Sequence, residues 1–324
     1  MTEGQSEQLS FPAEGSAALT PSTTLLKAAE VFELYMTNES FSPHTIKAFR
    51  GDLRLLGGYL GHDRLIGRIA TADLNKFLDY LLHERGVPCS PKSYARRVTT
   101  LKVFFKWLHR GGVLPQDPAA AVIQRSVGTP LPEILTDEEV ERALAVTAQM
   151  WQAEKPDPRP HLLLNLVLHT AIKKSECMAI RLKQIRRDTP DGPVLQIRYD
   201  DPRKQAKERK IPLPAGILPV LDDYVEVYAP QDVLFPCTAR NLEYVLADVA
   251  EKAGIKKRVK KGISFEMLRW TAAVRDYANG MEETRLRQKL GISEVTWQET
   301  GKKVKTLVSS LESQIANRKS QMAD

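Results

Sequence analysis

The sequence predicts a mainly α-helical protein with a small β-sheet, divided into two domains. Apolar residues recur at helical spacing over most of the 324 residues. Only two short segments, 194–199 and 209–213, show the features of strands. A stretch with one Gly and two Pro at residues 125–134 separates two helical regions and is typical of a linker. The chain is long enough to bury two hydrophobic cores.

The first domain is expected to be entirely helical. Residues 1–24 contain three acidic residues and no basic residue among many Ser, Thr, Gly and Pro, and we expect a disordered tail there. Residues 25–124 follow as one compact helical domain. Apolar periodicity and the Ser-Pro pairs at 42–43 and 90–91, which are typical of helix starts, predict four helices, at about 25–36, 43–60, 71–85 and 90–110.

The second domain, residues 135–324, is expected to combine helices with the two strands. Thr136 and Glu139 have the spacing of a capping box and predict a helix start. An apolar run at 161–170 predicts a buried helix. Further helices are expected at about 216–228, 239–253, 264–279, 283–290 and 302–318. The last has an apolar stripe (Val304, Leu307, Val308, Leu311, Ile315) that fits either its own domain or a neighbouring subunit.

Composition excludes several classes of protein. The chain has 47 basic and 40 acidic residues, a net charge of +7, which permits a nucleic-acid partner without requiring one. Cys89, Cys177 and Cys237 are scattered, which indicates reduced thiols in the cytoplasm and no zinc site. No cofactor or metal is expected. No apolar run reaches the ~18 residues that suggest a membrane span, and no secretory signal is visible.

Three clusters of basic residues are candidates for binding DNA. Residues 86–116 hold six basic residues and no acid: Lys92, Arg96, Arg97, Lys102, Lys106 and Arg110. A second cluster is Lys256, Lys257, Arg258, Lys260 and Lys261, and a third is Arg203, Lys204, Lys207, Arg209 and Lys210. Contacts to phosphates dominate the affinity of proteins for nucleic acids. The alternative is that each cluster is a solvated surface.

Six segments resemble, in the right order, motifs of tyrosine recombinases, the phage integrases and Xer-type enzymes. Residues 170–176 (TAIKKSE) resemble the TGLRxSE box, and residues 203–213 resemble the GKGxKxR-xxPL hairpin. Residues 265–271 (FEMLRWT) resemble the HxLRHT helix start, and residues 279–291 resemble the approach to the LGH box. Residues 116–119 and 135–139 resemble the junction between the family's domains. The resemblance implies an N-terminal SAM-like core-binding domain and a catalytic-type α+β domain.

The resemblance also implies a catalytic pocket, which this chain retains only in part. In the family two arginines clamp the scissile phosphate, a hairpin lysine protonates the leaving oxygen, two histidines assist, and a tyrosine attacks phosphorus. Such donors stabilise the negative charge of the transition state. Lys204 matches the lysine and Arg269 the second arginine, while Lys173 replaces the first arginine without its planar fork.

The remaining three positions are lost. Glu266 stands at the first histidine, Ile292 at the second and Gly301 at the nucleophile. No tyrosine follows Tyr277 and no histidine follows His169. An ionised carboxylate at 266 neither donates a hydrogen bond nor attracts a phosphate.

Each retained residue also has a purely structural interpretation. Lys173 and Lys204 fit surface lysines, Arg269 fits an ion pair with Glu266, and Ile292 fits ordinary core. The tyrosines that could replace the nucleophile are Tyr199, Tyr244 and Tyr277, and for each a core aromatic is the favoured interpretation.

We therefore expect a cytoplasmic, nucleoid-associated protein that binds double-stranded DNA and does not cut it. Its partners would be DNA and, through the C-terminal helix, a second copy or an active recombinase. The alternatives are an active recombinase with a displaced nucleophile, and an interaction module that does not bind DNA. The expected DNA-binding residues are Lys92, Arg96, Arg97, Lys102, Lys106, Lys173, Lys204, Lys207, Lys256, Lys257, Arg258 and Arg269.

Overall fold

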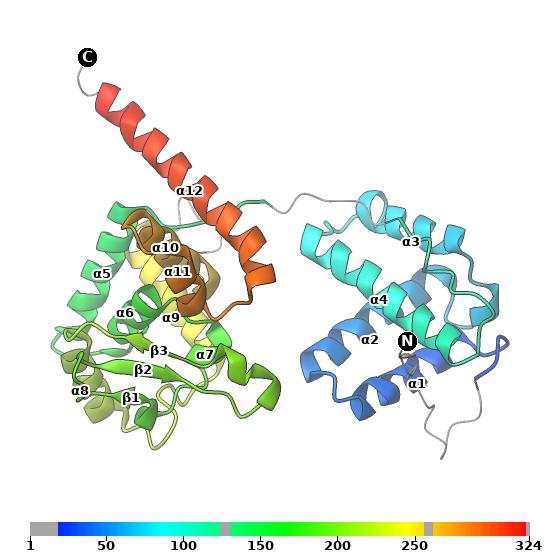
Figure 1. The fold of residues 1–324 in the computed structure, drawn as a ribbon, viewed down its shortest axis with the longest axis horizontal. Coiled ribbons are helices and arrows are strands. Elements are labelled where there is room, and N and C mark those ends of the chain that lie inside the picture. Colours follow the sequence, from blue (N-terminus) through cyan, green and yellow to red (C-terminus); the bar gives the residue numbers. More distant parts are fainter. Residues whose placement is uncertain (1–18, 124–129, 256–261, 322–324) are drawn as a thin grey trace, which may run out of the picture. The chain divides into compact units, whose positions relative to one another are not determined.

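The computed structural model describes residues 19–123, 130–255 and 262–321, with side chains described as far as residue 313 of the last helix. The chain divides into two compact units, residues 1–130 and 131–324 (Figure 1). Each unit has its own hydrophobic core.

The first unit is a four-helix domain. Its helices are α1 (Leu25–Asn38), α2 (Pro43–Leu60), α3 (Thr71–His83) and α4 (Pro91–Arg110), with a 3₁₀ turn at Ile66–Arg68. The hydroxyls of Ser42 and Ser90 accept from backbone N–H groups three residues on, at 3.1 and 3.2 Å, and a proline follows each serine at the first helical position. These caps give the predicted helix starts their physical basis.

The end of the predicted tail belongs to this unit. Residues 1–18 lie outside the described part of the chain. The hydroxyl of Thr24 caps α1, and the Thr23 carbonyl accepts from the N–H of Ile66 at 2.9 Å. These contacts place residues 19–24 with the helical domain rather than in a tail.

The second unit surrounds a central apolar helix, α6 (Arg159–Thr170), which packs against α5, α8, α9 and α10. The other helices of the unit are α5 (Asp137–Trp151), α7 (Lys174–Cys177), α8 (Ile217–Tyr228), α9 (Ala239–Lys252), α10 (Phe265–Ala278), α11 (Glu283–Leu290) and α12 (Glu294–Gln321). The run at 161–170 is apolar because neighbours cover α6 on several sides. Among the described residues, no helix is both long enough and apolar enough to span a bilayer.

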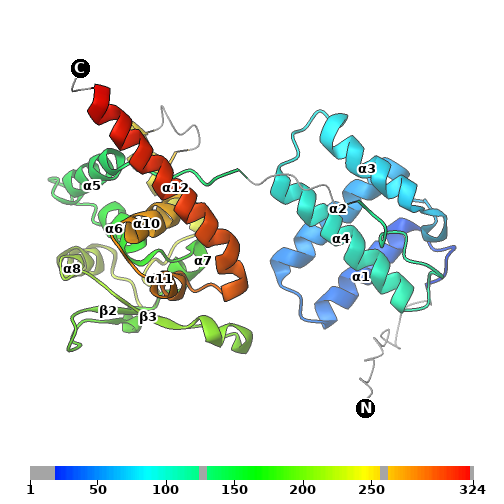
Figure 2. The same ribbon diagram turned by 45° about the horizontal axis from the view of Figure 1, so that its top comes forward.

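A three-stranded antiparallel sheet lies on one side of these helices (Figures 1 and 2). Its strands are β1 (Ile185–Arg186), β2 (Val194–Ile197) and β3 (Arg209–Pro212), in that order across the sheet. Leu195 pairs with Ile211 and Ile197 with Arg209. Leu195, Ile197 and Ile211 are buried, so this face of the sheet packs on the helices.

The structure differs from the sequence prediction at three places. Strand β1 was not predicted, because it is only two residues long and too short to show an alternation of apolar and polar residues. The connection between β2 and β3 contains a 3₁₀ helix at Pro202–Lys207. Helix α12 begins at Glu294 rather than at 302, because the Ser293 hydroxyl accepts from the Thr296 N–H at 3.3 Å and caps it. Residue 301 therefore lies within a helix.

The apolar stripe of α12 packs on its own unit. Val304 joins a cluster with Ala272 and Leu286, and Leu307 and Val308 pack with Val274 of α10. Ile134, at the end of the predicted linker, packs against the same cluster. The side chain of Ile315 lies outside the described residues.

Candidate functional site

Helix α4 presents a basic face on the first unit. Lys92, Arg96, Lys106 and Arg110 are exposed and Lys102 is half-buried. At 3.6 residues per turn these five fall within about one third of the helix circumference. A shallow cavity of about 700 Å³ beside the last turns of α4 is lined by Lys102, Lys106, His109 and Arg110 together with residues 115–117 and 120. His109 was not among the predicted DNA-binding residues, because the basic cluster was defined by lysine and arginine alone.

Arg97 lies off this face and is part of the domain's packing. Its side chain is 12 % exposed, and its Nε is 3.5 Å from the buried Asp52 carboxylate. Arg96 and Thr100 also bond to Asp52, at 2.7 and 2.9 Å. Burial raises the pKa of Asp52, and its hydrogen bonds to Thr100 and Arg96 oppose that rise. We therefore assign Arg97 to holding α4 against α2 rather than to a phosphate.

Two lysines that match the pocket motifs line a cavity of about 290 Å³ in the second unit. Lys173, at the start of α7, and Lys204 and Lys207, from the β2–β3 connection, line it together with Tyr199 and Glu176. Lys204 is exposed, and its Nζ is 3.4 Å from Asp201. The structure thus brings together Lys173 and Lys204, which the motif resemblance assigns to one pocket, with Lys207, which was expected only to bind DNA.

A buried ion pair braces the wall of this cavity. Glu176 of α7 accepts from both Nη atoms of Arg209 of β3, at 3.1 and 2.9 Å, and the two side chains are only 1 % and 8 % exposed. The Tyr199 hydroxyl also donates to Glu176. Burial acts to raise the pKa of Glu176, but the bonds from Arg209 outweigh it and hold that pKa below its ordinary value. Both residues belong to the quoted motifs, yet their pairing was not predicted.

Three cationic side chains bind three consecutive carbonyls where α11 ends. Arg209 Nε donates to the Lys289 carbonyl at 2.8 Å, Arg269 Nη2 to that of Leu290 at 2.6 Å, and Lys173 Nζ to that of Gly291 at 3.4 Å. The C-terminal end of a helix carries partial negative charge and unpaired carbonyls. The end of α11 thus accepts hydrogen bonds from Lys173 and Arg269, the two residues that match the phosphate-binding arginines of the family's motifs.

Arg269 is buried within this arrangement. It is 9 % exposed, and its other Nη donates to the Ala171 carbonyl. Burial lowers the pKa of Lys173, the charge of Glu176 opposes this, and the charge of Arg269 lowers it further. The ion pair between Arg269 and Glu266 that sequence spacing suggested does not form. Glu266 accepts instead from Trp270 Nε1 at 2.9 Å.

Two of the lost positions, Ile292 and Gly301, lie in packed surroundings. Ile292, at the second histidine, is half-buried and packs with a small cluster that includes Leu290 and Trp297. Gly301, at the nucleophile, is buried within α12. A Cβ added to Gly301 would lie 3.0 Å from Cε2 of the Trp297 ring. This contact was not predicted because the helix was expected to begin at 302, beyond both residues.

The three tyrosines considered as replacement nucleophiles have different environments. Tyr277 is half-buried against the clusters that hold α10 and α12 together. Tyr244 is 58 % exposed and accepts from Arg240 Nε at 2.7 Å, so the prediction of a core aromatic is wrong there. Tyr199 lines the cavity, and burial together with Glu176 raises its pKa to about 12.

The basic cluster at residues 256–261, which includes Lys256, Lys257 and Arg258, lies outside the described residues. Its predicted contact with DNA stays a prediction.

Comparisons with known proteins agree with the fold and the motifs. The profile of the phage integrase N-terminal SAM-like domain matches residues 29–112, and that of the phage integrase family matches residues 133–297. A tyrosine recombinase of Thermosipho africanus (strain TCF52B) is 23 % identical over 269 residues, covering 82 % of this chain and 90 % of that protein. Tyrosine recombinase XerD of Listeria innocua serovar 6a is 23 % identical over 278 residues, covering 81 % and 88 %.

Two solved structures share the fold. XerH recombinase bound to palindromic difH substrate superposes with a TM-score of 0.70 at 17 % identity, covering 90 % of this chain and 84 % of that one. A lambda integrase dimer bound to a COC' core site gives 0.65 at 15 % identity, covering 86 % and 95 %. The predicted fold class is confirmed: an N-terminal SAM-like helical domain precedes an integrase-type domain that is mostly helical with a small sheet. This chain belongs to the phage integrase family of tyrosine recombinases.

Proposed function

We propose that this chain binds double-stranded DNA and does not cleave or rejoin it. Its role would be architectural, regulatory or accessory in DNA recombination or integration. The observation that carries the proposal is Gly301, which is buried beneath Trp297 at the position where the family has its nucleophile. Covalent cleavage needs a side chain that attacks phosphorus, and this position has none.

The proton-transfer groups are missing as well. Glu266 at the first histidine is bonded to Trp270, and Ile292 at the second has no donor. Arg269 donates from both Nη atoms to backbone carbonyls. Preorganised donors around the phosphate stabilise its transition state, so their diversion supports loss of catalysis beyond the loss of the tyrosine.

Binding is supported by the charges that remain. The basic face of α4 and the cavity lined by Lys173, Lys204 and Lys207 present cations to solvent on both units. The XerH and lambda integrase structures of the same fold were solved bound to a palindromic difH substrate and to a COC' core site. Cations of this kind contact phosphates and fix the protein on the duplex without reading its sequence.

An active recombinase with a displaced nucleophile is the enzyme alternative. Tyr199 is the tyrosine that lines the cavity. Its hydroxyl donates to Glu176 and its pKa is raised to about 12, so it holds its proton where a nucleophile must release it. Its environment therefore favours a structural role.

Duplex binding at rising salt concentration tests the proposal. We expect a labelled duplex to shift in a gel at low ionic strength and the logarithm of the affinity to fall linearly with the logarithm of salt. Absence of a shift even at low ionic strength contradicts the proposal. An interaction module without DNA binding would instead keep its protein partner when Lys102 and Lys106 are reversed to Glu.

A further inference from the structure

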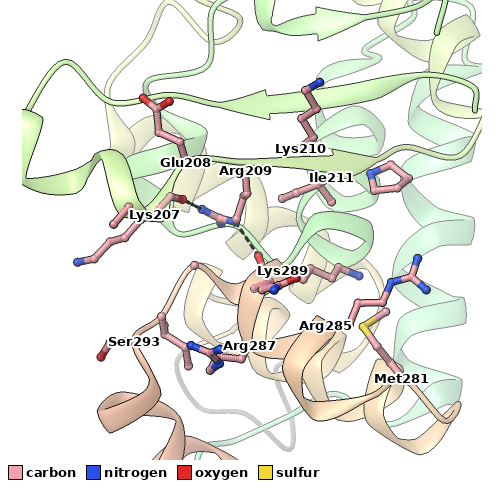
Figure 3. Close-up of a pocket in the computed structure, with 15 residues that line it drawn as sticks. Lys207, Glu208, Arg209, Lys210, Ile211, Met281, Arg285, Arg287, Lys289 and Ser293 are labelled. Atoms are coloured by element: carbon pink, nitrogen blue, oxygen red, sulfur yellow. Dashed lines mark hydrogen bonds between the residues drawn. The ribbon is translucent and has the colours of Figure 1, made fainter. Parts of the chain in front are cut away.

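A second and larger basic groove lies between β3 and α11, with a volume of about 830 Å³ (Figure 3). Ile211 and Pro212 of β3 and Met281, just before α11, give it apolar lining. Six cationic side chains line it as well: Lys207, Arg209, Lys210, Arg285, Arg287 and Lys289. The groove thus combines a concave shape with strong positive charge.

Four of the six cations are not neutralised within the described structure. Arg209 is paired with Glu176, and Lys289 with Asp276 at 2.6 Å. By contrast, Lys207, Lys210, Arg285 and Arg287 form no ion pair with any residue that the structure describes.

The acids nearby are engaged elsewhere. Glu208, the acidic residue in the lining, pairs with Arg198 and accepts from the Tyr199 N–H at 2.9 Å. Glu283, in the first turn of α11, pairs with Lys305 at 2.7 Å and accepts from Trp297. The groove therefore carries an excess of positive charge that its own neighbours leave uncompensated.

Scattered surface cations are normally solvated, but two features distinguish these. They line one groove from two elements far apart in sequence, with Lys207 and Arg287 toward one end and Arg285 toward the other, while the Lys210 side chain points away from α11 (Figure 3). A low-dielectric wall concentrates the field of such charges. Arg285 and Arg287 also present planar guanidinium groups, which match phosphate oxygens in pairs. Lys207 lines both this groove and the smaller cavity of Lys173 and Lys204, so the two are neighbours.

We propose that the β3–α11 groove is a binding site for linked phosphates, distinct from the cavity of Lys173 and Lys204. Both a DNA backbone and a free oligophosphate offer this chemistry. The site does not depend on duplex binding, because a free oligophosphate satisfies the same groups.

Inorganic triphosphate, titrated calorimetrically into the full chain, tests the proposal. The groove variant is Arg285→Gln/Arg287→Gln. The matched control is Arg186→Gln/Arg187→Gln, which removes the same charge beside β1, at the opposite edge of the sheet. We expect the groove variant to weaken triphosphate binding by a factor on the order of tenfold or more, since each charge-assisted bond contributes strongly. The control should retain the wild-type affinity.

A single exposed substitution, Arg285→Gln, keeps the test decisive if the double variant folds poorly. It should also weaken triphosphate binding, by a smaller factor. Equal affinity of wild type, groove variants and control overturns the proposal. Equal binding of an oligoglutamate of matched charge overturns it too, because the groove would then be a general surface for acids, including acidic proteins.

A duplex arm identifies the source of the phosphates. If the groove holds a DNA backbone, triphosphate competes with labelled duplex, and the groove variant weakens both ligands. If it holds a free oligophosphate, only triphosphate binding weakens. Either result supports the site. If the wild-type chain does not bind duplex DNA, only the proposed function is contradicted. The triphosphate titration then still tests the phosphate site in the groove.

Discussion

The indole ring of Trp297 lies against Gly301, four residues further along α12, so closely that a Cβ at position 301 would be 3.0 Å from Cε2. Family spacing assigns the nucleophile to this position, which has no side chain, and a Cβ there would require the Trp297 ring to shift. A single substitution back to tyrosine would have to displace the tryptophan.

Alanine at position 301 should stabilise the chain less than alanine at an open helical glycine. Replacing a mid-helix glycine ordinarily gains about 0.5–1 kcal/mol, and Gly51 in α2 has no atom within 4 Å of an added Cβ. Gly51→Ala should show that gain in thermal unfolding followed by circular dichroism. Gly301→Ala should show a smaller gain or a loss, because the Trp297 ring must move. Equal gains for the two variants contradict the contact.

The Glu176–Arg209 pair should be costly to break from one side. Removing one partner of a buried ion pair leaves an uncompensated charge and typically costs about 3–5 kcal/mol. Arg209→Met should cost that much in urea unfolding because it also leaves the Lys289 carbonyl without its donor. Glu176→Leu should cost a similar amount. The double variant should cost less than the sum, since no charge is then left alone. Strictly additive losses would mean that the two side chains do not interact.

Stability should fall in acid partly through Glu176. Its folded pKa is lower than its ordinary value of 4.5, since the bonds from Arg209 outweigh the effect of burial. A carboxyl with a lowered folded pKa stabilises the fold above the unfolded pKa, and this contribution is lost as the pH falls through the folded value.

Glu176→Gln removes this titration. The difference in unfolding free energy between wild type and Glu176→Gln should be constant at neutral pH and shrink below pH 4.5. A difference that does not change with pH would show that Glu176 titrates alike in the folded and unfolded chain.

The α4 face should determine part of the salt dependence of DNA binding. Lys102→Gln/Lys106→Gln removes two cations that line one cavity. Each lost phosphate contact should reduce the slope of log affinity against log salt by about one. The control Lys27→Gln/Arg50→Gln removes the same charge from residues already paired with Glu30 and Glu33. Equal slopes for the two variants, measured by fluorescence anisotropy, contradict the assignment of this face.

Local signals in the sequence predicted most helices correctly. Ser42-Pro43 and Ser90-Pro91 mark helix starts because a serine cap and a following proline act within one turn. The Thr136–Glu139 capping box also forms as predicted. Features that depend on distant residues were missed. Arg209 meets Glu176 across 33 positions of sequence, and Arg269 bonds to a carbonyl of α11.

The motif resemblance predicted which residues of the site lie together, which the periodicity of apolar residues does not. It assigned Lys173 and Lys204 to one vestigial pocket, and both line a single cavity. It did not predict that Arg269 would bond to two backbone carbonyls, or that Glu266 would bond to Trp270 rather than Arg269. The hydrogen-bond partners of Arg269 and Glu266 depend on side-chain geometry in three dimensions. Their i to i+3 spacing alone does not determine them.

A nicked suicide substrate tests the central claim most directly, because cleavage by a tyrosine recombinase leaves protein covalently joined to DNA. The wild-type chain, incubated with the nicked duplex and separated under denaturing conditions, is expected to give no protein–DNA adduct while still shifting that duplex in a native gel. Gly301→Tyr is expected to give none either, since Glu266 and Ile292 supply no proton donor. An adduct formed by the wild-type chain and abolished by Tyr199→Phe, Tyr244→Phe or Tyr277→Phe would contradict the account.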